Sequence, residues 1–201
     1  MSLLSLEHSK TVYWADALLY GLAIVALGGF VIAFVPGPLR WQSLAWVGLG
    51  LGAWTLIEYA MHRFVLHGLP PFCGWHAQHH ARPTALICTP TLVSGALFAG
   101  LVFAPAWALG GLWRACPLTL GLLIGYQFYS LTHHAIHHWR ADNAWLRQRK
   151  RHHSLHHHGD QPGFYGVTTA LWDQVFRTVR PSRTSGPSWP TRPANRPPSS
   201  A

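Results

Sequence analysis

The apolar and charged residues divide the chain into long uncharged runs separated by short polar segments. The uncharged runs cover residues 17–35, 41–57, 84–113 and 115–132. Each approaches or exceeds the roughly 20 residues that a helix needs to cross the hydrocarbon core of a bilayer. Pro90 and Pro105 interrupt the third run. We therefore expect an all-α integral membrane bundle of about four transmembrane helices, arranged as two hairpins, with a short turn near residues 107–117 joining the last two.

A cleaved signal peptide is the alternative for the first run, because a short charged stretch precedes it. The run is longer than the apolar core of a signal peptide, and no clear small-x-small cleavage pattern follows it. The sequence therefore favours a membrane span at this position.

The composition is also unlike that of a water-soluble protein. Apolar residues make up 49% of the chain and charged residues only 10%, whereas about 25% of the residues in a typical globular domain are charged. So few charges cannot cover a water-exposed surface, which excludes an ordinary soluble enzyme. Cys73, Cys88 and Cys116 form no CxxC pair and leave an odd count, so a disulfide framework is not expected either.

The basic residues are distributed unevenly among the polar segments. Of 15 Lys and Arg residues, only Arg40 and Arg114 fall in the two short connections on one side. Because basic loops remain on the cytoplasmic side, we expect both termini and the segments 62–83 and 133–180 there, as a His-rich helical cap. The basic excess is explained by this topology and by contact with anionic headgroups. No nucleic-acid motif accompanies it, so we expect no nucleic acid partner.

The chain is predicted to contain one membrane domain and one tail. Residues 181–201 are rich in Pro, Ser and Arg and contain Trp189 as their only large apolar side chain. Such a segment buries too little surface to offset its chain entropy, so we expect disorder. The membrane domain then covers residues 1–180.

The histidines carry the candidate chemistry. Fourteen of the 15 lie between residues 62 and 158, in the patterns H-x4-H, H-x2-H-H, H-H-x2-H-H and again H-x2-H-H. Residues i, i+3 and i+4 share one helix face, so each H-x2-H-H motif is expected to present three imidazoles in one direction. His62 and His67 are five apart, about 140° around an α-helix, which suits two different metals or a helix end. Imidazole is a common ligand of iron, copper and zinc, so the pattern predicts a bound metal cluster.

The positions of the histidines disfavour two other kinds of site. A bis-histidine haem is disfavoured, because such ligands lie within the spans of a bundle and these lie at or beyond the span ends. A His-rich membrane metal-binding or metal-transport protein is the alternative from another class. A transporter places its ligands near the membrane midplane, where these spans hold no ionisable residue.

Four segments together resemble the fatty acid hydroxylase/sterol desaturase superfamily, a group of membrane oxygenases with histidine boxes and a dimetal centre. They are 58–68 (EYAMHRFVLHG), 75–83 (WHAQHHARP), 129–138 (YSLTHHAIHH) and 150–176, which contains KRHHSLHHH and GFYGVTTALWDQVF. The resemblance covers about residues 45–178. It implies an integral membrane enzyme with the dimetal centre at the cytosolic face of a helical bundle. It also implies oxygen-dependent hydroxylation or desaturation of lipids.

The resemblance also assigns the metal ligands. It implies ten of them, five for each of two metals: His62, His67, His76, His79, His80, His133, His137, His153, His156 and His157. The remaining candidates for a supporting role around these ligands are His134, His138, His152, His158, Glu58 and Asp160. Asp142 and Asp173 are further acids that could orient an imidazole. Iron is expected in the active form, with O2 as cosubstrate, although purified protein could carry zinc.

The expected reaction is hydroxylation of the acyl chain of a membrane lipid. Desaturation, or a sterol or carotenoid substrate, is the alternative within the superfamily, and Ser130 stands where the fatty acid 2-hydroxylase branch is expected to carry Asp. We expect electrons to come from a separate polypeptide of ferredoxin or cytochrome b5 type, because the sequence shows no dinucleotide fingerprint and no flavin or haem motif. The basic stretch Arg147, Arg149, Lys150 and Arg151 could dock such a donor or contact headgroups.

Glycines in the second and fourth runs are also open to two interpretations. They are Gly48, Gly50, Gly52, Gly121 and Gly125. Small residues there either leave room for an alkyl chain or let two helices pack closely, and we favour close packing.

Overall fold

The computed structural model describes residues 7–158 and 162–179. The predicted tail 181–201 and Asp160 lie outside this part of the chain. Within it the residues form helices, and an isolated β-bridge joins Glu7 to Ile87. The helices are α1 (Lys10–Phe34), α2 (Arg40–Ala60), α3 (Phe72–Ala81), α4 (Thr91–Leu97), α5 (Ala104–Gly110), α6 (Leu112–His138), α7 (Ala144–His158) and α8 (Leu171–Val175).

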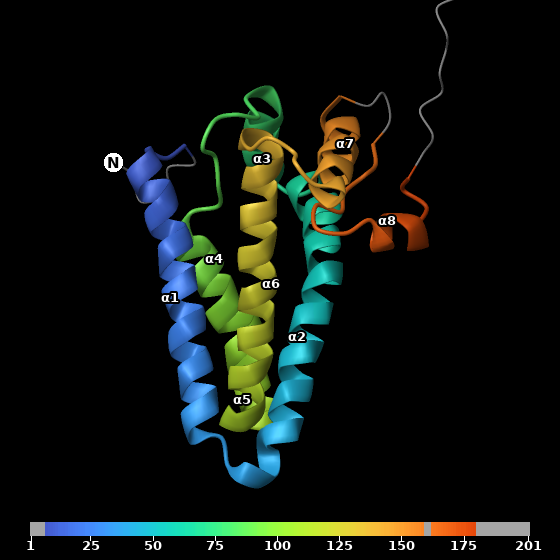
Figure 1. Cartoon of the computed structure of the whole chain (residues 1–201). Coiled ribbons are helices and arrows are strands. Elements are labelled where there is room, and N and C mark those ends of the chain that lie inside the picture. The colour runs from blue at the N-terminus through green and yellow to red at the C-terminus, as the bar shows by residue number, and fades with distance from the viewer. Residues whose placement is uncertain (1–6, 159–161, 180–201) are drawn as a thin grey trace, which may run out of the picture.

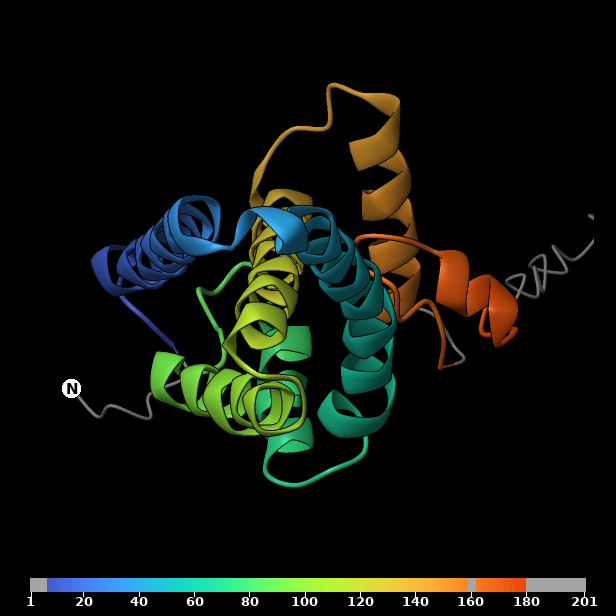
Figure 2. The same ribbon diagram turned by 90° about the horizontal axis from the view of Figure 1, so that it is seen from below.

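The long helices form an elongated bundle, and α3, α7 and α8 gather at one end of it (Figure 1). α1, α2, α6 and the rod formed by α4 and α5 run along the bundle, and the view from below places α6 among the others (Figure 2). α3 and α7 lie at the end where α1 begins and α6 ends, and α8 lies beside them. This end therefore carries all of the His-rich segments.

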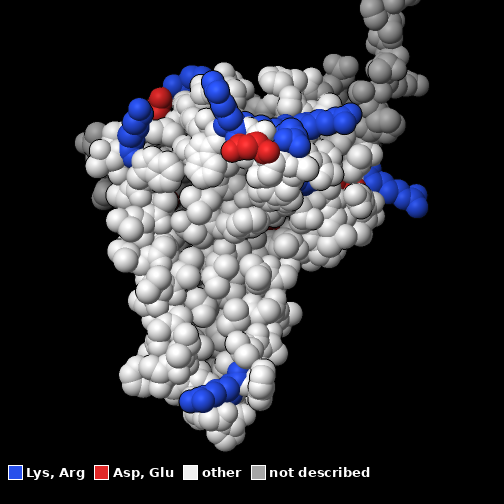
Figure 3. All heavy atoms as spheres, in the orientation of Figure 1, with Lys and Arg blue, Asp and Glu red and all other residues white. Residues whose placement is uncertain are grey.

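The wall of the bundle is apolar. Exposed side chains include Leu22, Val25, Ile32 and Leu101, and Ile32 is 80% exposed. In Figure 3 the charged side chains gather at the end that holds α3 and α7 and at the opposite tip, and the surface between them is uncharged. Such a band suits a lipid environment, because in water it would leave a large apolar area exposed, which is unfavourable.

Three stretches of the described residues are long and apolar enough to cross a membrane, where the sequence predicts about four. They are Lys10–Phe34, Gly37–Leu66 and Thr91–Gly110. The fourth predicted run lies in α6, which is 27 residues long. α6 contacts α1, α2 and α5, and much of its middle is buried by these helices. A helix surrounded by protein needs less apolar surface than one surrounded by lipid, which explains its lower hydropathy.

The third predicted run differs from its expected course. The helix begins at Thr91 rather than at residue 84, because Pro90 stands at its N-cap and the preceding residue is kept out of the helical region. Pro105 does not break the rod. A π-helical segment, Phe98–Phe103, leads directly into α5, which carries Pro105 in its first turn, where its missing N–H is tolerated. The break before α6 falls at Gly111, which has φ of +74°.

Close packing of α2 against α6 explains three of the five glycines. A Cβ atom on Gly50 or Gly121 would collide with the backbone of the facing helix, and one on Gly125 would collide with the Trp54 side chain. A Cβ atom on Gly48 or Gly52 would meet nothing within 4 Å. The interpretation as close helix packing therefore holds for Gly50, Gly121 and Gly125. Gly48 and Gly52 face open space.

Candidate metal centre

The four histidine segments meet at one end of the bundle. One follows α2, the second is α3, the third ends α6 and the fourth lies in α7. Their imidazoles form two groups whose nitrogen atoms could each hold a metal ion.

The first group, called the five-histidine group below, contains His62, His67, His76, His80 and His156. One nitrogen from each lies within 4.8 Å of all the others. Neighbouring Nε2 atoms are closer: 3.0 Å from His62 to His76, 3.0 Å from His76 to His80, 3.1 Å from His80 to His156 and 3.0 Å from His156 to His67.

The second group, called the four-histidine group, contains His79, His133, His137 and His153. The Nε2 atoms of His133, His137 and His153 lie 2.9 to 3.2 Å from one another. His157, the tenth predicted ligand, lies outside this group, but its Nε2 atom is 3.0 Å from that of His153. Its ring stacks on His80 at 4.1 Å between centroids, so it lies where the two groups meet. The structure thus brings all ten predicted ligands together.

Each H-x2-H-H motif is divided between the groups. His76 and His80 enter the five-histidine group while His79 enters the other, and in α7 the assignment is reversed: His156 enters the first group and His153 the second. Each motif therefore presents its imidazoles to two neighbouring groups and not to a single one. Residues i and i+4 lie nearly above one another on a helix, whereas i+3 is rotated to the other side of that line. Two facing helices can thereby supply both groups.

His62 and His67 belong to one group, so the proposal that they serve different metals is wrong. The expected angle of 140° assumed an α-helix, but Met61–Leu66 is π-helical and His67 is its C-cap. Hydrogen bonding from i to i+5 brings residues five apart toward the same side. The two imidazole centroids lie 5.3 Å apart as a result. The alternative expectation, a helix end at His67, agrees with the structure.

The nitrogen spacing fits metal ions better than hydrogen bonds among the imidazoles. Ligand nitrogens at right angles around an ion with metal–nitrogen distances of about 2.1 Å lie about 3 Å apart. A neutral imidazole carries only one N–H, so several converging Nε2 atoms cannot all be satisfied by donating to one another. In addition, both ring nitrogens of His79 and the Nδ1 atoms of His153 and His157 are buried with no hydrogen-bond partner among the described residues.

The imidazoles are held in the neutral form that binds metals. Burial lowers the pKa of His79 and His157 to about 3 and that of His67 and His156 to about 4, and the charges of neighbouring histidines lower these pKa values further. Below its pKa a protonated imidazole has no lone pair to donate. The lowered pKa values therefore keep the nitrogens available to a metal ion at neutral pH.

A loop after α7 orients two ligands of the five-histidine group. His62 donates from Nδ1 to the carbonyl oxygen of Tyr165 at 2.5 Å, and His156 donates from Nδ1 to that of Gly163 at 2.8 Å. A proton fixed on Nδ1 leaves the lone pair of Nε2 directed into the group. The sequence does not reveal these carbonyls, because backbone atoms leave no trace in a side-chain pattern.

Two buried carboxylates hold this loop in place. Asp173 accepts hydrogen bonds from the backbone N–H groups of Tyr165 and Gly166 at 2.9 and 2.7 Å. Glu58 accepts from the N–H groups of Val167 and Thr168 at 2.7 and 2.8 Å, and from the Thr168 hydroxyl at 2.6 Å. Glu58 and Asp173 therefore reach the ligands through the loop backbone and not through direct bonds to an imidazole.

The other predicted supporting histidines lie around the groups without joining them. His134 is 3.2 Å from the Tyr13 hydroxyl through Nδ1 and stacks on His138. His152 packs against Phe164. His158 is exposed at the end of α7, and Asp142 is exposed in the turn before that helix.

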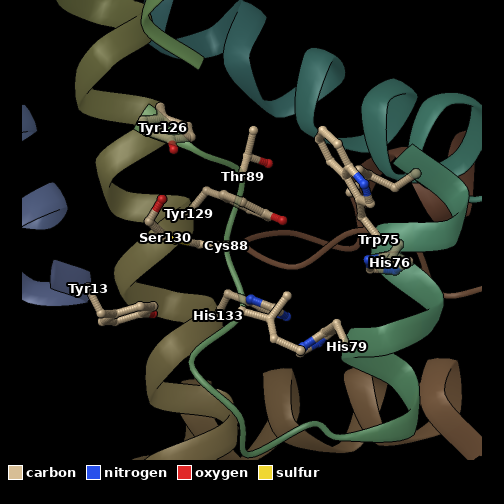
Figure 4. A pocket seen from close by; sticks show the side chains of 12 residues that line it. Tyr13, Trp75, His76, His79, Cys88, Thr89, Tyr126, Tyr129, Ser130 and His133 are labelled. Carbon is tan, nitrogen blue, oxygen red and sulfur yellow. The ribbon is translucent and has the colours of Figure 1, made fainter. Parts of the chain in front are cut away.

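A cavity of about 110 Å³ adjoins the imidazoles. His76, His79 and His133 line one side of it, and Leu66, Trp75 and Ile87 contribute apolar surface. In Figure 4, Tyr126, Tyr129, Ser130, Cys88 and Thr89 lie across the cavity from His76 and Trp75. The cavity is thus mostly apolar, with several hydroxyl groups near the imidazoles.

The fold and the site together define a helical membrane protein with a histidine-rich centre suited to two metal ions. The chain matches the model of the fatty acid hydroxylase family over residues 47–178. It therefore belongs to that family.

Characterised relatives are lipid hydroxylases. The chain is 33% identical over 176 residues to a ceramide very long chain fatty acid hydroxylase of Schizosaccharomyces pombe, covering 76% of this chain and 47% of that protein. It is 31% identical over 193 residues to a dihydroceramide fatty acyl 2-hydroxylase of Arabidopsis thaliana, covering 85% and 75%. A human fatty acid 2-hydroxylase is 33% identical over 67% of this chain and 39% of its own. The chain thus spans about half the length of the fission yeast relative.

A solved structure has the same fold. The visible hydroxylase domain of full-length scs7p superposes with a TM-score of 0.75 at 25% sequence identity, covering 89% of this chain and 69% of that one. The coverage extends beyond the residues matched by the family model, so the shared fold includes more than the histidine segments.

Proposed function

We propose that the protein is an oxygen-dependent membrane hydroxylase that inserts one oxygen atom into a C–H bond of a lipid acyl chain. The observation that carries this proposal is the pair of imidazole groups beside a largely apolar cavity. The relatives named as fatty acid or ceramide hydroxylases support it. Their names favour the carbon next to the carbonyl group as the site of reaction, in preference to desaturation or to a sterol or carotenoid substrate.

The proposed membrane arrangement places the metal centre at the cytoplasmic surface. α6 acts as the fourth span, enclosed by α1, α2 and the α4–α5 rod, and the segments 62–83 and 133–180 form the cap. Arg40 and Arg114 start α2 and α6 at the opposite tip, which agrees with the asymmetry expected of a cytoplasmic cap. Liganding groups at one end of the spans, rather than at their midplane, disfavour metal transport.

The ten histidines would hold two iron ions in the active protein, and zinc could replace iron during purification. Bound iron supplies the activation of O2 that an unactivated C–H bond requires. The residues of the chain would hold the metal ions in position and form the surroundings of the bound acyl chain. Neutral imidazoles present their lone pairs, the carbonyls of Gly163 and Tyr165 fix two ring orientations, and Leu66, Trp75 and Ile87 exclude water around a bound chain.

We propose that electrons come from a separate protein that docks on the exposed basic residues of α7. Of the four basic residues predicted for docking, Arg149 is buried and Lys150 donates to the carbonyl oxygen of Ile136 at 2.6 Å. Arg147 and Arg151 are exposed and one helical turn apart on α7. A docking surface for an acidic donor would therefore use Arg147 and Arg151.

Lipid mass spectrometry tests the function. The protein is expressed in a host with a reconstituted electron donor, beside variants His153→Ala and His156→Ala, which remove one ligand from each group. Lipids that gain one oxygen atom with the wild type but with neither variant would support hydroxylation. A loss of two hydrogens would show desaturation instead, and identical lipids from all three at full wild-type metal content would refute an oxygenase.

A further inference from the structure

We propose that the groove between the end of α6 and the start of α7 binds one zwitterionic phospholipid, with its phosphate at Arg140 and its ammonium group at Asp142. The site lies outside the metal centre, and the proposal does not depend on the reaction that the metal centre carries out. The cap therefore recognises one kind of headgroup in addition to contacting the bilayer surface.

The groove is large enough to hold part of a lipid. It has a volume of about 650 Å³ and is lined by the last turns of α6, the turn 139–143 and the first turn of α7. In Figure 2 the segment that joins α6 to α7 loops outward from the bundle. The volume falls within the roughly 300–1,000 Å³ of typical ligand pockets, so a headgroup and the upper part of an acyl chain can occupy it.

The groove lies on the opposite side of α6 from the cavity beside the imidazoles. The α6 residues that line the groove are spaced i, i+3, i+4 and i+7, so they share one face of the helix: Phe128, Leu131, Thr132 and Ala135. Those that line the cavity each precede one of these by two residues: Tyr126, Tyr129, Ser130 and His133. Two residues correspond to about 200° around an α-helix. The groove is therefore a separate site and not an entrance to the cavity.

The α6 side of the groove suits an acyl chain. Phe128 is 51% exposed and Leu131 is 37% exposed, and the Phe128 ring lies 5.8 Å from that of Trp145 on α7. Residues 128–135 span roughly 10 Å along the helix axis. Both exposed residues belong to the uncharged run 115–132, so the groove continues the apolar wall of the bundle. An acyl chain can thus pass from the bilayer into the groove without leaving an apolar surface.

The turn supplies one charge of each sign. Arg140 and Asp142 both line the groove and are exposed. Over residues 7–158 and 162–179 neither side chain has an ion-pair or hydrogen-bond partner, and the ion pair in this range joins Arg82 to Glu7. A phosphate and an ammonium group on one ligand complement such a pair of charges. An anionic lipid or an acidic protein would place negative charge against Asp142.

The turn is held in place before any ligand binds. Asn143 accepts a hydrogen bond from the Leu146 N–H at 2.8 Å through Oδ1, and Arg147 donates to the carbonyl oxygen of Asp142 at 3.3 Å. A fixed backbone reduces the ordering cost of binding.

The groove also lies at the depth of the headgroups. Trp139 and Trp145 line it and are 53% and 43% exposed, and tryptophan is enriched at the level of lipid headgroups. In Figure 3 the charged side chains at this end border the uncharged surface of the bundle. A headgroup in the groove therefore remains in register with the surrounding bilayer.

The first test compares two lipids that share a phosphate and acyl chains. Dioleoylphosphatidylethanolamine (DOPE) carries an ammonium group and dioleoylphosphatidylglycerol (DOPG) does not. The complete chain in mild detergent is titrated with each lipid, and the affinity for the first bound lipid is measured by native mass spectrometry. We expect DOPE to bind about fivefold more tightly, the range of one exposed ion pair. Asp142→Asn should abolish this preference. A wild type without a preference for DOPE, or an Asp142→Asn protein that keeps the preference, would overturn the proposal.

The phosphate contact is tested in the same way. Arg140→Gln should weaken the binding of DOPE and DOPG by a similar factor, because both lipids carry the phosphate. Arg40→Gln is the matched control at the opposite tip and should leave both affinities unchanged. Equal losses in Arg140→Gln and Arg40→Gln, or no loss in Arg140→Gln, would show that the phosphate does not bind at Arg140.

A second pair of variants tests the location. Leu131→Trp fills the groove and should remove the tightly bound DOPE, whereas Leu101→Trp enlarges a 72% exposed leucine on the apolar wall and should not. Thermal unfolding in detergent shows that both variants are folded. Equal DOPE binding by the two variants would overturn the proposal. A wild-type dimer that DOPE does not dissociate and that Leu131→Trp abolishes would also overturn it, because a second copy would then occupy the groove.

Discussion

The Nδ1 atom of His62 lies 2.5 Å from the carbonyl oxygen of Tyr165, although 103 residues separate them in sequence. The bond ties the π-helical segment Met61–Leu66, which follows α2, to the loop that follows α7. Asp173 and Glu58 hold this loop by accepting five hydrogen bonds from it. The orientation of a candidate metal ligand therefore depends on two carboxylates that lie outside both imidazole groups.

Asp173→Asn should weaken metal binding at the five-histidine group. The amide places an N–H₂ group opposite the N–H of Tyr165 or Gly166, so at least one loop hydrogen bond is lost. Substituting such outer partners typically lowers metal affinity about 10- to 100-fold. Competition with a chelator, read by elemental analysis, measures the affinity. Glu7→Gln, in an exposed ion pair with Arg82, is the control and should have little effect. Equal affinities for Asp173→Asn and the wild type would show that the loop does not orient the ligands.

The hydrophobic pattern predicts the helical bundle well, because span length and charge placement follow from the bilayer. The ten candidate ligands follow from motif resemblance. The division of these ligands into two groups cannot be predicted from the motifs, since it depends on how α3 and α7 face each other. The contact between His62 and His67 also escapes prediction, because a π-helical segment is decided by packing and not by the propensities of Met61–Leu66.

Helix packing can be tested with matched glycine substitutions. Gly121→Ala places a methyl group against the backbone of Val47 and Leu51, whereas Gly48→Ala places one in open space. The first should lower the free energy of unfolding by about 1–3 kcal/mol through overpacking, and the second should change it little. Thermal unfolding in detergent compares the two proteins. Similar midpoints would contradict the close contact of α2 with α6.

The stability of the metal-free protein should depend on pH. In the folded state the pKa values of His79 and His157 are about 3 and those of His67 and His156 about 4, against an ordinary value of 6.5. Above pH 6.5 these residues are neutral in both the folded and the unfolded state, so they contribute no pH dependence to the stability. Between pH 6.5 and about 4 the unfolded chain binds protons that the folded chain does not, so stability falls as the pH falls.

Thermal unfolding of metal-free protein between pH 7.5 and 5 measures this effect. The zinc-loaded protein is the control, because bound metal opposes protonation and should move the loss of stability to lower pH. A midpoint that stays constant in the metal-free protein over this range would show that the histidines are not buried in the neutral form.

Charge reversal on α7 tests the docking surface. Arg147→Glu combined with Arg151→Glu should slow turnover with an acidic electron donor, most strongly at low salt, because the electrostatic attraction that speeds association is lost. Metal content should not change, since neither residue is a candidate ligand. The rate is measured against donor concentration at several ionic strengths. Identical rates for the variant and the wild type at every ionic strength would place the docking surface elsewhere.

The ratio of metal ions to protein chains tests the central claim, that two imidazole groups form a dimetal centre. We predict two ions per chain in the folded wild-type protein by elemental analysis. The double variant His67→Ala, His80→Ala removes two ligands from the five-histidine group and should retain one ion. His133→Ala with His137→Ala removes two from the four-histidine group and should also retain one. A ratio of about one in the wild type that neither double variant lowers would contradict the dimetal centre.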